Sequence, residues 1–176
     1  MGMEMTMKLL GALLVLTGCT GTGWQRSEAL GERVRSMEEI STVIWKIRGE
    51  IRVSGIPLGH VFLQVSDQVA APWADVLRSL SRRMEAQEGE RFQELWAAEL
   101  PALHRECYRP EDWNCLLGLG QSLGYLDLTM QVELLDGFLA EWGRRTEECR
   151  REKQEKQKVC QCLGLAAGAF LVLLLV

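Results

Sequence analysis

One short stretch of the sequence has the spacing of a catalytic motif. Gly120-Gln-Ser122-Leu-Gly124 fits G-x-S-x-G, in which a strand enters a strained turn that exposes a nucleophilic serine. The reaction also needs a histidine later in the chain. Here the preceding residues have a helical pattern, and both histidines, His60 and His104, come before Ser122. The sequence therefore argues against a hydrolase.

A metal site is the second chemistry that the residue types allow. His104 and Cys107 are close in the sequence and Cys115 follows, but no CxxC pair and no fourth ligand at zinc-like spacing accompany them. Cys160 and Cys162 would point to different faces of a helix. No phosphate-binding loop and no dinucleotide fingerprint occurs. We therefore expect no catalytic residue, no metal, no cofactor and no small-molecule substrate, so that the protein is not an enzyme.

Charge is distributed unevenly along the 176 residues. The apolar fraction of 47% and the charged fraction of 25% are ordinary for a globular protein. The net charge of -4 gives no reason to expect nucleic-acid binding, which usually needs a basic face. Residues 9–16 and 163–176 carry no charge, whereas nearly all the charged residues lie between Arg26 and Lys158. This pattern predicts membrane ends around a soluble centre.

The charge-free ends predict transmembrane anchors at residues 8–24 and 159–176, with a soluble domain at residues 25–158 between them. Each anchor is marginal, because about 16 residues at a rise of about 1.5 Å span ~24 Å of a ~30 Å hydrocarbon core. Gly164 and Gly168 form a small-xxx-small face on which the two anchors could pack. Equally, these glycines could simply occur in an apolar helix.

Basic residues on the domain side of both anchors favour a domain that stays in the cytoplasm. Seven Lys and Arg residues lie between Arg144 and Lys158, just before the second anchor. The alternative is a lipoprotein, because Leu16-Thr-Gly-Cys19 has the form of a bacterial lipoprotein cleavage site. Lipidation at Cys19 would export a helical, ligand-binding domain together with all of these basic residues.

Apolar residues between the anchors recur at spacings of three and four, which predicts an all-α, multi-helix bundle. The first stripe is the longest: Leu30, Val34, Met37, Ile40, Ile44, Ile47 and Ile51. Further helices are expected to open at Pro57 and to follow Pro72. Gly124 is expected to end a later helix in the left-handed conformation, and Asp127 to cap the last one. The tryptophans fall on or near these stripes and are expected in the core.

From Met7 onward the chain resembles the stage III sporulation protein AB family of endospore-forming bacteria. The resemblance rests on four stretches: Lys8 to Leu16 running on to Gly23-Trp24; Glu50-Ile51 with Pro57-Leu58; Gly120-x-x-Leu123-Gly124-x-x-Asp127-x-x-x-Gln131; and Leu163-Gly164 with Gly168 and the apolar end. The third stretch is the most specific. The Thr17-to-Gly23 stretch is polar for an anchor and departs from the pattern.

The resemblance implies a scaffold or platform in the assembly that links mother cell and forespore. It also implies a soluble domain similar to the cytoplasmic domain of type II secretion platform proteins. The implied partners are a secretion-type ATPase and other stage III membrane proteins, and the implied location is the mother-cell membrane around the forespore. Glu50, Asp127 and Gln131 could line a binding face, or Asp127 could be a helix cap and Glu50 a solvated charge.

Overall fold

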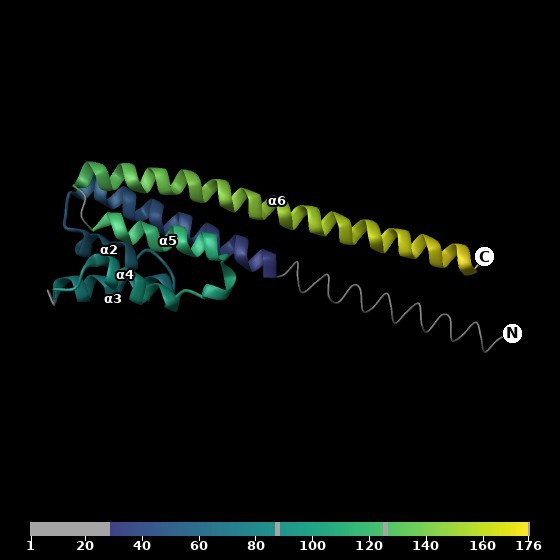
Figure 1. Ribbon diagram of the computed structural model, residues 1–176, viewed down its shortest axis with the longest axis horizontal. Helices are drawn as coiled ribbons and strands as arrows, with labels where there is room; N and C mark the ends of the chain where they lie inside the picture. Colours follow the sequence, from purple (N-terminus) through teal and green to yellow (C-terminus); the bar gives the residue numbers. More distant parts are fainter. Residues whose placement is uncertain (1–28, 87–88, 125–126, 176) are drawn as a thin grey trace. The chain divides into compact units, whose positions relative to one another are not determined.

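The computed structural model describes residues 29–86, 89–124 and 127–175, and every regular element in them is helical. The first helix covers residues 29–54. It is followed by α2 (Leu58–Ser66), α3 (Trp73–Glu85), α4 (Phe92–Glu99), two short 3₁₀ turns (Leu100–Ala102 and Arg105–Cys107), α5 (Pro110–Leu123) and α6 (Leu128–Leu175) (Figure 1). The predicted all-helical bundle is confirmed.

The described residues fall into two compact units. The larger, here called the bundle unit, is Arg35–Thr146, and the smaller contains residues 29–34 and 147–175. The bundle unit holds most of the first helix, α2 to α5 and the beginning of α6. All sites considered below lie within it.

The predicted stripe of the first helix is the core of the bundle unit. Met37, Ile40, Ile44 and Ile47 are fully buried, and Ile51 is 2% exposed. Burying a side chain of this size contributes about 1.5–3 kcal/mol to stability, so this face holds the helix in place.

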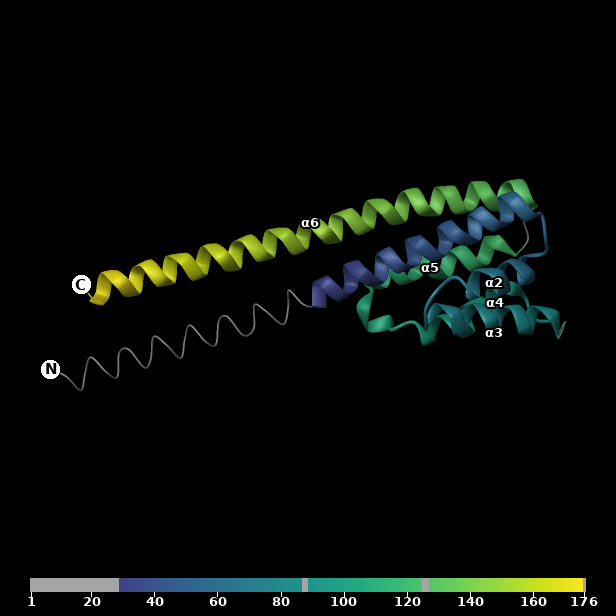
Figure 2. The same cartoon turned by 180° about the vertical axis from the view of Figure 1, so that it is seen from behind.

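The first part of α6 runs antiparallel beside the first helix in both views (Figures 1 and 2). The indole Nε1 of Trp142 donates a hydrogen bond to the carbonyl oxygen of Met37 at 2.9 Å. Further along, Nε of Arg48 lies 2.6 Å from Oδ1 of Asp136. Because residue numbers rise along one helix as they fall along the other, the two contacts fix the register of the pair.

An aromatic cluster joins α2, α3 and α4. Phe62 stacks on Phe92 with ring centroids 5.8 Å apart, and Trp96 lies 5.9 Å from Phe92 and 6.4 Å from Trp73. Nε1 of the buried Trp96 donates to the carbonyl oxygen of Leu116 in α5 at 2.8 Å. The indole therefore has no unsatisfied polar atom, which buried tryptophans generally avoid.

Three local expectations were wrong. Pro57 precedes α2 as its N-cap residue instead of opening it. Gly124 has φ −76° and ψ −12°, the right-handed helical region, so it does not end α5 in the left-handed conformation. Trp45 is 62% exposed, whereas Trp73, Trp96, Trp113 and Trp142 are buried as expected.

The expected anchor at residues 8–24 lies outside the described residues. Residues 159–175 continue α6, as expected for a last helix that runs on through the charged stretch. Within the described part of the chain, no helix combines the length and the apolarity that crossing a membrane requires.

Candidate interaction surface

Two glycines of the 120–131 motif lie where α5 passes closest to α4. A Cβ added at Gly120 would lie 2.3 Å from Cδ1 of Trp96, and one added at Gly124 would lie 2.5 Å from Cβ of Phe92. Real Cβ atoms essentially never approach other heavy atoms below 3.0 Å. The backbone itself is therefore the contact surface here, which explains glycine at both positions without any need for an unusual backbone conformation.

The rest of the motif joins the end of α5 to the start of α6. Leu123 is 1% exposed, and its carbonyl oxygen accepts a hydrogen bond from Nε2 of Gln131 at 3.0 Å. Oδ1 of Asp127 accepts from the backbone N–H of Met130 at 2.9 Å, three residues into α6. This is the geometry of a helix N-cap. The polar side chains of the motif thus bind backbone groups at the α5–α6 junction.

The other motif residues lie in the first helix and at the start of α2. Glu50 is half-buried, and its Oε1 accepts from Nε2 of Gln68 at 3.4 Å. The carbonyl oxygen of Pro57 accepts from the N–H of His60 at 2.9 Å, and Leu58 is half-buried. The structure therefore brings Gly120, Leu123, Gly124, Asp127 and Gln131 together, and it places Glu50, Pro57 and Leu58 in separate contacts.

The glycine pair expected in the second anchor lies in α6. Gly164 is exposed, and a Cβ added there would meet nothing within 4 Å. The anchor that these glycines were expected to contact, residues 8–24, lies outside the described residues. The expected packing therefore stays a prediction.

Residues that could have done chemistry are placed differently from a catalytic site. Ser122 is half-buried in the last turn of α5, and helix instead of strand precedes it. His60 is exposed in α2, and the exposed His104 has its Nδ1 3.4 Å from Oε1 of Glu106. Among the described residues no three His, Cys, Asp or Glu side chains gather as a metal site would require.

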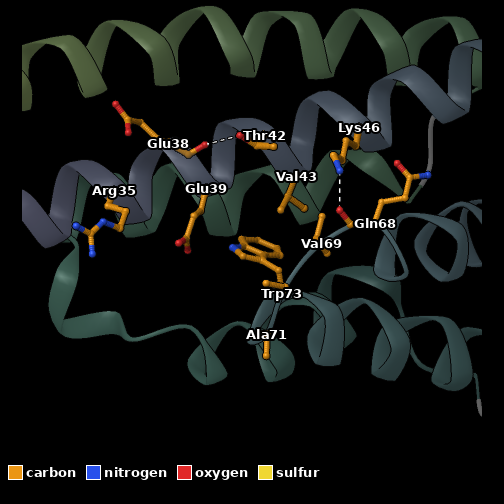
Figure 3. A pocket seen from close by; sticks show the side chains of 11 residues that line it. Arg35, Glu38, Glu39, Thr42, Val43, Lys46, Gln68, Val69, Ala71 and Trp73 are labelled. Carbon is orange, nitrogen blue, oxygen red and sulfur yellow. Dashed lines mark hydrogen bonds between the residues drawn. The ribbon is translucent and has the colours of Figure 1, made fainter.

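An open groove of about 360 Å³ lies between the first helix and the connection from α2 to α3 (Figure 3). One wall is a polar face of the first helix and the other is the connection at residues 68–71, while Trp73, 3% exposed, lies at its base. The lining residues are Arg35, Glu38, Glu39, Thr42, Val43, Lys46, Gln68, Val69, Ala70, Ala71 and Trp73.

The groove carries charges of both signs above an apolar base. Nζ of Lys46 donates to the carbonyl oxygen of Gln68 at 2.6 Å, which ties the two walls together. Arg35, Glu38 and Glu39 line the same groove. A nucleophile paired with a base is not among the lining residues, so the chemistry offered is that of binding, to a chain with its own mixture of polar and apolar groups.

Sequence reasoning missed the exposed Trp45. A signal for it existed, because Trp45 follows Ile44 directly and so lies off the buried stripe of the first helix. An aromatic residue beside a complete apolar stripe cannot share that stripe's face, since neighbouring residues are about 100° apart around a helix.

Comparison with known proteins gives three consistent findings. A family model described as stage III sporulation protein AB matches residues 8–176. The stage III sporulation protein AB of Bacillus subtilis (strain 168) is 22% identical over 170 residues, which cover 96% of this chain and 99% of that protein. A solved structure of stage III sporulation protein AB (SpoIIIAB) superposes with a TM-score of 0.60 at 17% identity, covering 70% of this chain and 98% of the other. At that identity the structural likeness concerns the fold alone.

Proposed function

This chain belongs to the stage III sporulation protein AB family, and we propose from that premise that it is a non-enzymatic membrane platform of the stage III sporulation assembly. In this role it would hold a secretion-type ATPase and other stage III proteins at the mother-cell membrane around the forespore. The observation that carries the proposal is the family match, which extends over both apolar ends as well as the helical domain.

Membrane anchoring is supported by the sequence at the two ends. Residues 9–16 and 163–176 are free of charged side chains. Basic residues between Arg144 and Lys158 precede the second of these ends, and such flanks stay on the cytoplasmic side. The domain would then face the cytoplasm, with both chain ends at the opposite face.

A platform role is supported by what the motif side chains do. Asp127 and Gln131 bind backbone groups, and Gly120 and Gly124 allow α5 to pack closely on α4. Motif residues of this kind stabilise a shape, as a scaffold requires, and do not present a reactive group to solvent. The open groove beside the first helix is then available for a partner.

Complementation tests the role. A Bacillus subtilis strain that lacks its stage III sporulation protein AB should regain heat-resistant spores when it produces this chain, although the 22% identity could prevent exchange between species. A chimera that keeps the B. subtilis ends and carries residues 25–158 of this chain controls for that. If both proteins are made and neither restores any spores, the proposed role is wrong.

Topology is tested with Ala97→Cys, an exposed position on α4, in a chain whose native cysteines are replaced by serine. A membrane-impermeant maleimide should label position 97 only after cell lysis. Labelling in intact cells would instead support the alternative, a lipoprotein whose exported helical domain binds a ligand. Loss of palmitate incorporation in Cys19→Ala would then identify the lipidated residue.

The absence of catalysis is tested at Ser122. Ser122→Ala removes the one side chain that fits a nucleophile motif, and it should restore sporulation as well as the parent chain does. His60→Ala and His104→Ala should behave in the same way. A folded Ser122→Ala chain without function would support an enzyme.

ATPase docking is tested by co-purification of the two proteins from membranes. A double charge reversal in the groove, Glu38→Lys with Glu39→Lys, should reduce the amount of ATPase recovered if the groove takes part. A matched reversal outside the groove, Glu94→Lys, is the control, because Glu94 is exposed on α4. If the parent chain recovers no ATPase, docking of the ATPase is wrong.

A further inference from the structure

The solvent-facing side of the first helix carries an apolar ridge that nothing in the described chain covers. Trp45 is 62% exposed and Val53 is 85% exposed. Gly49 lies between them, and a Cβ added there would meet no atom within 4 Å. The spacing i, i+4, i+8 places all three on one line along the helix surface, here called the Trp45 ridge.

The ridge belongs to a helix whose core face is already complete. Ile40, Ile44 and Ile47 are fully buried on that other side. Trp45 therefore contributes nothing to the core, and an exposed tryptophan of this kind is typical of the centre of a protein–protein contact. The glycine notch beside it is wide enough for the ridge of a second helix to enter, as in ridges-into-grooves packing.

The charges that flank the ridge are basic. Lys46 donates to a neutral carbonyl oxygen, so its charge is not offset there. Arg48 is neutralised by Asp136, whereas Arg52 is exposed on the same side. Glu50 turns away and contacts Gln68. In a chain of net charge -4, this is a local positive rim around an apolar centre.

We propose that the Trp45 ridge docks an amphipathic helix of a partner protein whose apolar face is flanked by acidic residues. The partner's large apolar side chains would enter the Gly49 notch beside Trp45, and its carboxylates would face Lys46 and Arg52. The proposal rests on the proposed scaffold function, and it adds the surface and the chemistry of one partner.

Two other occupants fit less well. A second copy of this chain would bring Lys46 and Arg48 of both ridges together, whether the helices ran parallel or antiparallel about the centre of the ridge, and like charges repel. A membrane surface attracts basic side chains, but it needs a broad apolar face. The Trp45 ridge has only two large apolar side chains, with a gap between them.

The test uses the full chain in neutral detergent and two labelled amphipathic peptides of about 18 residues, five helical turns. They share a leucine face and differ only in carrying Glu or Lys beside it. Fluorescence anisotropy should show that the Glu peptide binds about tenfold more tightly or better, and that added salt weakens it. Equal affinity for both peptides would overturn the proposal.

Variants locate the binding. Trp45→Ala and Gly49→Leu should each weaken the Glu peptide about tenfold or more, the first by removing the anchor and the second by filling the notch. Gly49→Leu is compatible with the helix, because open space surrounds that position. Leu63→Ala is the matched control, since Leu63 is an exposed apolar residue on α2, and it should change nothing. Unchanged binding to both ridge variants would overturn the proposal.

The other occupants have their own readouts. A dimer in sedimentation experiments that Trp45→Ala dissociates would replace the proposal with self-association. An environment-sensitive dye on Trp45→Cys that shifts to the blue in phosphatidylglycerol vesicles would replace it with membrane contact. If spores are not restored but the peptides are still distinguished, the scaffold function fails and the ridge stands. Restored spores without discrimination between the peptides would remove the ridge alone.

Discussion

The backbone at Gly120 comes so close to Trp96 that a Cβ there would lie 2.3 Å from Cδ1 of the indole. Trp96 cannot move aside easily, because its Nε1 is hydrogen-bonded to Leu116 and its ring packs on Phe92 and Trp73. Gly120→Ala should therefore lower the free energy of unfolding by about 1–3 kcal/mol, or by more if α4 and α5 separate. Thermal unfolding followed by circular dichroism measures it.

Gly118 is the matched control for this substitution, because it lies in the same helix and an added Cβ would meet nothing within 4 Å. Gly118→Ala should stabilise the chain by about 0.5–1 kcal/mol through the better helix propensity of alanine. If both variants shifted the melting temperature in the same direction, the close approach at Gly120 would not be limiting.

Gln131 should contribute to stability through its bond to the end of α5. Its Nε2 donates to the carbonyl oxygen of Leu123, and both residues are buried. Gln131→Leu leaves that carbonyl without this donor and should cost about 1–3 kcal/mol in free energy of unfolding. Gln131→Glu should cost at least as much, because a carboxylate cannot donate to a carbonyl oxygen. A neutral result in chemical denaturation would contradict the role of Gln131 at this junction.

Ile44 lies at the centre of the buried stripe and is fully inaccessible to solvent. Ile44→Asp puts an unpaired charge into the core and should cost about 4 kcal/mol or more, enough to unfold a domain of ordinary stability. Thr42→Asp, two residues away on the exposed side, should stay within about 0.5 kcal/mol of the parent chain. Similar circular dichroism melts for the two variants would mean that the stripe is not the core face.

Tyr108 makes stability depend on alkaline pH. Burial raises the pKa of Tyr108 to about 12, against about 10 for an exposed tyrosine. Below pH ~10 the phenol is protonated in both states, so its contribution is complete. As the pH rises from ~10 through the folded-state pKa, the unfolded chain loses the proton first and the free energy of unfolding falls.

Tyr108→Phe should therefore show a smaller loss of stability over that pH range than the parent chain, in denaturant titrations at fixed pH. Absorbance of the ionised phenol gives an independent check, because one of the two tyrosines should titrate near pH 12. An identical pH dependence in the parent chain and in Tyr108→Phe would show that Tyr108 is not the group responsible.

Much of the fold was predictable because it depends on periodicity within each helix. The stripe from Met37 to Ile51 identifies both the helix and its buried face, since each position depends only on its neighbours three and four residues away. Asp127 as the cap of α6 is local in the same sense, because its carboxylate binds an N–H three residues later. The resemblance to the family likewise rested on short stretches of sequence.

Tertiary structure alone decided the rest. Gly124 was predicted to take a left-handed conformation, but it is helical, and glycine is required there by Phe92, a residue distant in sequence. Local periodicity carries no information on which helix passes closest to which. The exposure of Trp45 and the groove above Trp73 have the same origin: the first helix has two sides, and only the packing of α2 to α6 determines which parts of its second side stay open.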